Sequence, residues 1–348
     1  MAQINKPNLY FNTKLYTGNG STQSISGIGF QPDWTWIKNR STAGEGHHLY
    51  DAVRGVTKRL RSDTTAAEST ASTGLTTFGT DGFTVGSNDG CNKNGVGIVS
   101  WNWKAGTGQG SSNTDGSTNT TYTSVNTTAG FSISQYTGTS SAATIGHGLG
   151  AVPAMIIVKN LSSGSRKWVV WHKNLSANTK YLSLNETAAE ATDTATWNNT
   201  APTSTVFSSA GSGEVNQNGE NFIAYCFAEK KGFSKFGTYT GNGNVDGPMI
   251  YSGFKPAWGI FKRTNSTGNW IIMDNKRSPF NEMQKNLFAN TNDVEDSSTS
   301  YNDFDFVSNG VKIREDNNDI NASGSTYIYM LFAENPIVGT NNIPATAR

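Results

Sequence analysis

The sequence predicts an all-β protein made of three tandem, divergent β-sandwich domains. Composition is the first support: Gly, Ser, Thr and Asn are abundant, aromatic residues make up 11% of the chain, and charged residues only 15%. Aromatic and β-branched residues suit half-buried strands, whereas Gly and Asn suit tight turns. The length of 348 residues fits two or three domains, since a domain usually has ~100–150 residues.

A second support is a pattern of landmarks that occurs three times. Each copy begins with a Tyr-Thr-Gly signature, at Tyr16, Tyr136 and Tyr239. A proline follows 16 or 17 residues later and opens an apolar segment that ends in lysine, at 32–38, 153–159 and 256–262. Each copy closes with a long apolar and aromatic segment, at 96–103, 222–228 and 327–333. The shared order and spacing predict one fold present three times.

The third support is the spacing of the apolar segments. Short strands separated by Gly and Asn turns, over roughly 100 residues per copy, are typical of a sandwich or jelly roll. The closing segments carry apolar residues on both alternating faces, which predicts a central strand covered on two sides. The best helical candidates, 64–70 and 186–192, are short and weakly amphipathic.

These landmarks also predict the domain boundaries. Residues 106–126 are rich in Gly, Ser, Thr and Asn without apolar periodicity, a composition typical of a flexible linker. Lys230, Lys231 and Gly232 form a much shorter connection. We therefore expect the second and third domains to be held closely and the first more loosely. The predicted order is an N-terminal arm at 1–10, sandwiches at 11–105, 130–230 and 231–338, a linker at 106–129 and a tail at 339–348.

Charge and hydropathy exclude several classes of function. The formal net charge of +1 excludes strong electrostatic attraction to nucleic acid or to an anionic membrane. No stretch approaches the ~20 apolar residues that span a bilayer, and the N-terminus lacks the apolar run of a secretory signal. We expect synthesis in a cytoplasm. Cys91 and Cys226 are the only cysteines, so no disulfide framework is expected, and Cys226 should be a buried free thiol.

Three segments of the first copy resemble a known family. They are GFQPDWTWIKNR at 29–40, LYDAVRG at 49–55 and DGF at 81–83, and they resemble a repeat domain of virion appendage proteins from tailed bacteriophages, especially marine and cyanobacterial phages. The second copy departs from the pattern, with His172 in place of the Asp51-like residue, whereas the third retains Asp274. The resemblance implies a lectin-like sandwich and a structural virion component in a tail fibre, tail tip or capsid decoration. It implies no catalytic motif.

No catalytic or metal-binding motif is evident from the residues themselves. The sequence has no G-x-S-x-G, C-x-x-C or H-E-x-x-H. His47 and His48 lack a third ligand at a supporting spacing, so we favour a solvated loop over a metal site. Carboxylates could pair for glycoside hydrolysis only by meeting in the fold, and the candidates are Asp51, Asp274, Glu229 and Glu334. We expect no enzyme activity and no cofactor.

An acidic stretch near the C-terminus is a weaker candidate for Ca²⁺. It lacks the EF-hand spacing, so a solvated loop is favoured, and its residues are Asp293, Glu295, Asp296, Asp303 and Asp305.

Repeated lysines and tryptophans complete the set of candidate residues. The lysines that end the proline-led segments should extend their ammonium groups to water over apolar stems, and they are Lys38, Lys159 and Lys262. Tryptophans alternate along the strands, so core packing explains most of them. Any exposed tryptophan could stack on a sugar ring, and we take as candidate glycan or partner contacts Trp34, Trp101, Trp168 and Trp270.

We therefore expect a structural bacteriophage protein that resides in the virion, of the tail-fibre or tail-tip type. It would form a homo-oligomer, contact other virion proteins and bind host surface glycans, without nucleic acid or membrane insertion. The alternatives are a capsid decoration protein, a stand-alone carbohydrate-binding module and a polysaccharide-degrading enzyme. The chain has no heptad run or shaft repeat, which makes a compact appendage as consistent with the sequence as a fibre.

Overall fold

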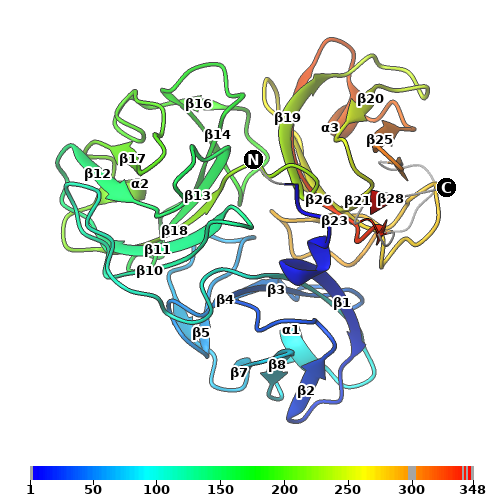
Figure 1. The fold of residues 1–348 in the computed structure, drawn as a ribbon, viewed down its shortest axis with the longest axis horizontal. Helices are drawn as coiled ribbons and strands as arrows, with labels where there is room; N and C mark the ends of the chain where they lie inside the picture. Colours follow the sequence, from blue (N-terminus) through cyan, green and yellow to red (C-terminus); the bar gives the residue numbers. More distant parts are fainter. Residues whose placement is uncertain (1–2, 297–302, 339–340, 342–343, 346–348) are drawn as a thin grey trace.

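The computed structural model describes residues 3–296, 303–338, 341 and 344–345, so most of the predicted tail at 339–348 lies outside the described residues. The chain is almost entirely β-structure, as predicted, and forms three lobes around a common centre (Figure 1). We call residues 11–105 lobe 1, residues 106–230 lobe 2 and residues 231–338 lobe 3. No helix in the described segments has the length and apolar character to cross a bilayer.

Each lobe pairs a large antiparallel sheet with a small one, and the strand order of the large sheet is the same in all three. In lobe 1 the large sheet is β1 (Phe11–Thr17), β9 (Gly97–Trp103), β3 (Trp34–Asn39) and β4 (His47–Asp51), the small sheet is β2 (Gln23–Ser26), β8 (Gly82–Val85) and β7 (Leu75–Gly79), and β5 (Lys58–Arg59) pairs with β6 (Ser69–Thr70).

The corresponding large sheet of lobe 2 gains strands at both edges. It is β10 (Tyr122–Asn126), β11 (Phe131–Thr137), β18 (Asn221–Phe227), β13 (Met155–Asn160), β14 (Trp168–His172), β15 (Lys180–Ser183) and β16 (Ala191–Thr192), and the small sheet is β12 (Ala143–Gly146) with β17 (Val206–Ser209).

Lobe 3 repeats the order a third time. Its large sheet is β19 (Ser234–Thr240), β26 (Thr326–Ala333), β21 (Pro256–Arg263), β22 (Ile271–Asp274) and β23 (Leu287–Phe288), its small sheet is β20 (Met249–Tyr251), β25 (Gly310–Ile313) and β24 (Phe304–Val307), and β27 (Ile337–Val338) pairs with β28 (Pro344–Ala345).

The closing strands β9, β18 and β26 are central and apolar on both faces because each large sheet is covered twice. Along β18, Phe222, Ala224 and Cys226 face the small sheet of their own lobe, in a core that also contains Ile145 and Phe207. The alternate residues, such as Tyr225, face the inner core that all three lobes share. The predicted strand covered on two sides is therefore confirmed.

Aromatic rings join the lobes pairwise in this inner core. The ring centroids of Trp34 and Tyr225 are 4.5 Å apart, which joins lobes 1 and 2. Trp103 and Trp258 are 5.4 Å apart and join lobes 1 and 3, and Phe227 lies 6.2 Å from Phe332 between lobes 2 and 3. The expectation that the first copy is held loosely is wrong, because its inner face is buried against both other lobes.

Residues 106–126 are not the flexible linker that their composition suggests. The Asp33 carboxylate accepts hydrogen bonds from the backbone N–H groups of Ala105, Thr107 and Gly108, at 2.8 to 3.0 Å. Thr118 then pairs with Ile145 beside β12, and the segment ends in β10. Gly110 has φ +77°, and a Cβ there would meet the Thr123 carbonyl oxygen at 2.0 Å. Glycine is therefore required at position 110 by the close approach of the β10 backbone.

Three other segments also contact neighbouring lobes. In the N-terminal arm, Ile4 is buried in the inner core, and its N–H donates to the Lys231 carbonyl oxygen at 3.0 Å. Segments 64–70 and 186–192 form no helix, because inter-lobe contacts occupy their backbone and only the short β6 and β16 form there. The α-helices of the described chain have four residues each and are α1 (Asp89–Asn92), α2 (Gly213–Asn216) and α3 (Asn318–Asn321).

Candidate functional site: the polar networks between the lobes

The four candidate tryptophans have no face free for a sugar. Their exposed fractions are 0% for Trp34, Trp101 and Trp168 and 1% for Trp270, and all nine tryptophans of the chain are at most 5% exposed. Three of them donate indole N–H groups across lobe boundaries instead. This burial corrects the expectation of a stacking surface and places these residues in the joints between the lobes.

The first repeated joint is a ring N–H that donates to a carbonyl of another lobe. Trp168 donates to the Arg61 carbonyl oxygen at 2.8 Å, and Trp270 donates to that of Ser183 at 2.9 Å. His47 occupies the equivalent position of lobe 1, opposite the lysine of the neighbouring strand, and its Nε2 lies 2.9 Å from the Phe288 carbonyl oxygen.

The histidine pair is therefore buried on β4 rather than solvated. Trp36 Nε1 donates to His47 Nδ1 at 2.8 Å, so the ring proton of neutral His47 lies on Nε2 and points at Phe288. Burial lowers the pKa of His47 well below its usual value and that of His48 to about 3. Both rings are neutral packing elements in this environment.

The second repeated joint is a backbone hydrogen bond from a glutamate. The N–H of Glu68 donates to the Leu161 carbonyl oxygen at 3.0 Å, joining lobe 1 to lobe 2. Glu190 donates to Thr264 and Glu295 to Arg40, both at 2.8 Å. These bonds join lobe 2 to lobe 3 and lobe 3 to lobe 1. The three contacts therefore close a ring around the centre of the molecule.

Two of the three repeated lysines belong to the same joints. Lys159 Nζ donates to the Thr65 carbonyl oxygen at 2.7 Å, and Lys262 Nζ to that of Thr187 at 3.2 Å, both across a lobe boundary. Lys38 Nζ donates within its own lobe, to Glu45 O at 2.5 Å. All three side chains are fully buried, so their ammonium groups do not extend to water as predicted. Burial lowers the pKa of each to about 8.

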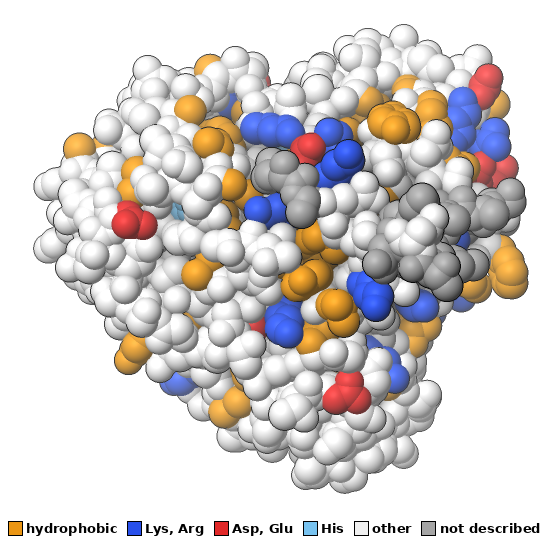
Figure 2. All heavy atoms as spheres, in the orientation of Figure 1, with side chains coloured by type: hydrophobic (Ala, Val, Ile, Leu, Met, Phe, Trp, Pro, Cys, Tyr) orange, Lys and Arg blue, Asp and Glu red, His pale blue; other side chains and the backbone are white. Residues whose placement is uncertain are grey.

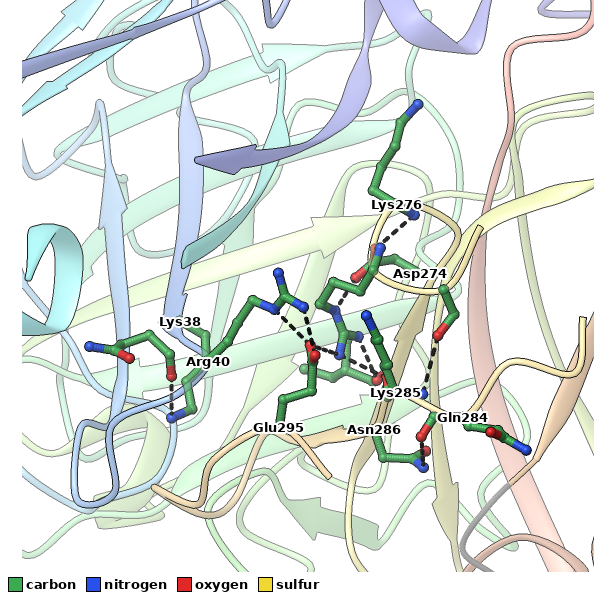
Figure 3. A network of polar contacts seen from close by, with 12 residues as sticks. Lys38, Arg40, Asp274, Lys276, Gln284, Lys285, Asn286 and Glu295 are labelled. Carbon is green, nitrogen blue, oxygen red and sulfur yellow. Dashed lines mark hydrogen bonds and ion pairs between the residues drawn. The ribbon is translucent and has the colours of Figure 1, made fainter. Parts of the chain in front are cut away.

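The third kind of joint is a network of hydrogen bonds and ion pairs centred on Asp51 in lobe 1 and on Asp274 in lobe 3. Asp51 Oδ2 lies 2.5 Å from Arg54 Nε and accepts the Tyr225 hydroxyl of lobe 2 at 2.7 Å. Asp274 Oδ2 repeats this arrangement in lobe 3, with Arg277 Nε at 2.5 Å and the Trp101 indole of lobe 1 at 3.0 Å. Both arginines also approach a glutamate at 3.2 Å, Glu68 for Arg54 and Glu295 for Arg277. Figure 3 shows Asp274 and Glu295 of the lobe 3 network.

Lobe 2 lacks this network as a whole. His172 stands at the position of the aspartate, and Leu175 follows it at the spacing of the arginine. The cross-lobe donor is also missing, because the β26 residue at the position of Trp101 and Tyr225 is Met330. Charge, counter-charge and donor are thus absent together, which leaves no buried charge without a partner.

Each of the four candidate carboxylates is bound by neighbouring side chains. Asp51 and Asp274 are bound as described, Glu229 bridges Lys173 and Lys235 at 2.8 Å each, and Glu334 pairs with Lys255. Burial alone would raise the pKa of Glu229, but the two lysines lower it below its usual value. Each of the four carboxylates thus has at least one cationic partner.

Two residues of the acidic stretch, Glu295 and Asp305, are bound to arginines, whereas Asp293 is exposed. Glu295 accepts from Arg40 and Arg277, and Asp305 accepts from Arg314 at 2.6 Å. Burial raises the pKa of Asp303 to about 6. Among the residues the structure describes, no three His, Cys, Asp or Glu side chains are placed to hold a metal ion.

A buried asparagine that recurs in all three lobes was not predicted from the sequence. Asn92, Asn216 and Asn321 end the three short helices, are fully buried and bind the turn that follows the Tyr-Thr-Gly signature. The signature tyrosines donate to the carbonyl before each asparagine, as Tyr16 does to Cys91 at 2.7 Å. The sequence pattern that could have predicted these asparagines is Asn-x-x-Gly, which occurs at 92–95, 216–219 and 321–324.

Two hollows border these networks. One, of about 330 Å³, lies between lobes 1 and 2 and has Arg54 and Glu68 in its walls. The other, of about 500 Å³, is in lobe 3 beside Arg277 and is lined by the 81%-exposed Phe280. On the face drawn in Figure 2, uncharged atoms predominate and basic side chains gather near the middle, where the lobes meet.

Comparison with known proteins identifies a family without an assigned function. No curated protein sequence matches the chain. A family described as a domain of unknown function (DUF7483) matches residues 6–336, which include residues of all three lobes. The chain therefore belongs to the DUF7483 family.

Proposed function

We propose that this protein is a structural component of a bacteriophage virion, an appendage of the tail-fibre or tail-tip type that contacts other virion proteins. The observation that carries the proposal is the closed ring of joints from Glu68 to Leu161, Glu190 to Thr264 and Glu295 to Arg40. A body whose aromatic, cationic and acidic side chains hold its own lobes together is suited to bear load and present its outer surface. The resemblance of the first copy to phage appendage repeats supports the same role.

Capsid decoration is the second candidate. It is favoured by the packing of the N-terminal arm, because Ile4 enters the inner core and bonds to Lys231. The described part of that arm lies on the body instead of reaching toward a shaft. The stand-alone carbohydrate-binding module is less favoured, because the tryptophans that would stack on sugars are buried.

The test is mass spectrometry of purified phage particles, combined with chemical crosslinking in the same sample. We expect the chain among the particle proteins, with crosslinks from its exposed lysines to tail proteins. Crosslinks to the capsid alone would assign the decoration role. Absence from the particles would refute the virion proposal, and a glycan array would then test the carbohydrate-binding alternative.

Homo-oligomer formation and glycan binding remain part of this proposal. Sedimentation velocity of the purified protein measures the first. A glycan array measures the second, and there binding should survive substitution of the buried Trp168 by phenylalanine, provided that the variant folds.

A further inference from the structure

The hollow between lobes 1 and 2 has mixed walls from three parts of the chain. Its volume is about 330 Å³. Lobe 1 supplies charged groups, segment 106–126 supplies an amide and a tyrosine ring, and lobe 2 supplies an apolar residue with further amides. The lining residues are Val53, Arg54, Lys58, Glu68, Gln109, Tyr122, Gln135, Leu161, Ser162 and Asn221.

The joint between lobes 3 and 1 shows what the equivalent position holds. There the Glu295 N–H bonds to the Arg40 carbonyl, as the Glu68 N–H bonds to that of Leu161. The Arg40 guanidinium turns back onto the Glu295 carboxylate with two hydrogen bonds, from Nε at 2.8 Å and from Nη2 at 2.6 Å (Figure 3). A two-pronged contact of this kind is among the strongest polar contacts in proteins.

Leucine at the corresponding position leaves Glu68 without that guanidinium. Arg54 Nη1 approaches the Glu68 carboxylate at 3.2 Å, as Arg277 Nη1 approaches Glu295, also at 3.2 Å. The only additional cation at Glu68 in the described structure is Lys58, at 3.8 Å with a side chain 42% exposed. An exposed lysine at this distance contributes little, so Glu68 keeps the capacity to accept a planar, two-pronged donor.

The third joint differs from both. Between lobes 2 and 3 the Glu190 carboxylate accepts the Ser176 hydroxyl and N–H, and the position of Arg40 is taken by Thr264. Glu190 does not line any hollow described here, so it provides a matched control for Glu68.

The remaining walls also suit a guanidinium group. Tyr122 contributes an aromatic residue to the lining, and guanidinium groups bind aromatic faces. Gln109 donates its Nε2 to the Val53 carbonyl at 3.0 Å, which leaves its Oε1 as an acceptor for the five N–H donors of an arginine. Leu161 provides an apolar surface for the side-chain stem.

We propose that this hollow binds the arginine side chain of a partner protein, with Glu68 in the role that Glu295 plays for Arg40. The identification of that partner as a neighbouring virion protein rests on the function proposed above, whereas the guanidinium site itself rests only on the comparison of the joints.

The first test titrates the full chain with L-argininamide and follows the side-chain amide signals of Gln109, Gln135 and Asn221 by NMR. L-citrullinamide, which has a similar shape without the charge, should bind at least about tenfold more weakly. Glu68→Gln should weaken argininamide binding by a similar factor, and the control Glu190→Gln should leave it unchanged. Equal binding of the two amides, or wild-type binding by Glu68→Gln, would overturn the proposal.

A second variant fills the site with a guanidinium group from the chain itself. Leu161→Arg should place its own guanidinium on Glu68 and thereby abolish argininamide binding. The Glu68→Gln change should then lower the unfolding temperature more in the Leu161→Arg background than in the wild type. Retained argininamide binding by Leu161→Arg, or preferential occupation of the hollow by a neutral oligosaccharide, would overturn the proposal. None of these outcomes depends on whether the chain is found in virions.

Discussion

The buried Asp51–Arg54 pair offers a strong test of the joints between lobes. Lobe 2 of the same chain has uncharged residues, His172 and Leu175, at the equivalent positions. The side chains of both residues are at most 1% exposed, and the Tyr225 hydroxyl of lobe 2 donates to the same carboxylate oxygen. Asp51→Ala would leave the Arg54 guanidinium buried without its main counter-charge. Breaking a buried pair in this way costs about 3–5 kcal/mol, so we expect a loss near 4 kcal/mol in the free energy of unfolding.

Replacing this network in lobe 1 by the residues of lobe 2 should lower the free energy of unfolding much less. The triple variant Asp51→His, Arg54→Leu, Tyr225→Met copies His172, Leu175 and Met330, and it leaves no buried charge. Replacement of a buried ion pair by apolar groups is often neutral, whereas loss of the Tyr225 ring from its 4.5 Å contact with Trp34 costs about 1 kcal/mol. We expect a net loss of about 1–2 kcal/mol.

The assay is equilibrium unfolding in guanidinium chloride, followed by far-UV circular dichroism and by tryptophan fluorescence. Nine buried tryptophans make the fluorescence sensitive to the inner core. A converse variant, His172→Asp, inserts an acid without an arginine and should destabilise the protein by about 3 kcal/mol. If the triple graft costs as much as Asp51→Ala, the three positions do not act as one unit and the reasoning fails.

Three further predictions concern the ring of joints, the buried lysines and the repeated asparagine. The shared inner core should make the chain unfold in one transition, so well-separated transitions by circular dichroism and fluorescence would contradict it. Lys38, Lys159 and Lys262 have pKa values of about 8, against ~10.4 for a free lysine. Between these values the unfolded chain binds more protons, so the free energy of unfolding should rise from about pH 8 to 10. Lys159→Met should remove about a third of that rise. If the free energy of unfolding depends on pH in the same way in Lys159→Met and in the wild type, burial of Lys159 is not the cause. Asn216→Ala should lower the free energy of unfolding by about 2–3 kcal/mol, because two carbonyl oxygens and one N–H lose their partner. Thermal denaturation of this variant, compared with the surface control Asn218→Ala, measures the loss.

The sequence was sufficient for the strands because their physical signals are local. Proline-led apolar segments and long closing segments predict central strands, and β13, β18 and their counterparts lie where expected. The same apolar residues could not indicate how many lobes share a core. Tyr225 and Phe222 look alike in sequence, yet one faces the inner core and the other its own small sheet.

Composition does not indicate structure where the contacts of a segment are long-range. Segment 106–126 has the amino acids of a linker, but the Asp33 carboxylate and the β12 edge hold it in place. Likewise Glu68 and Leu161, 93 positions apart in the printed sequence, carry no local sign that they meet. The hollow beside them depends on the absence of an arginine that only the joint at Glu295 reveals.

The differences among the three joints bear on why the copies share one chain. A homotrimer of one lobe would have three identical joints, since a single sequence would form each of them. Here the joint between lobes 3 and 1 is filled by Arg40, that between lobes 2 and 3 has a serine–glutamate contact, and that between lobes 1 and 2 keeps an acceptor beside a hollow. Because the three lobes belong to one chain, one joint can carry a specific contact that the other two joints lack. It lets a partner bind in one orientation, and it predicts a stoichiometry of one arginine site per chain.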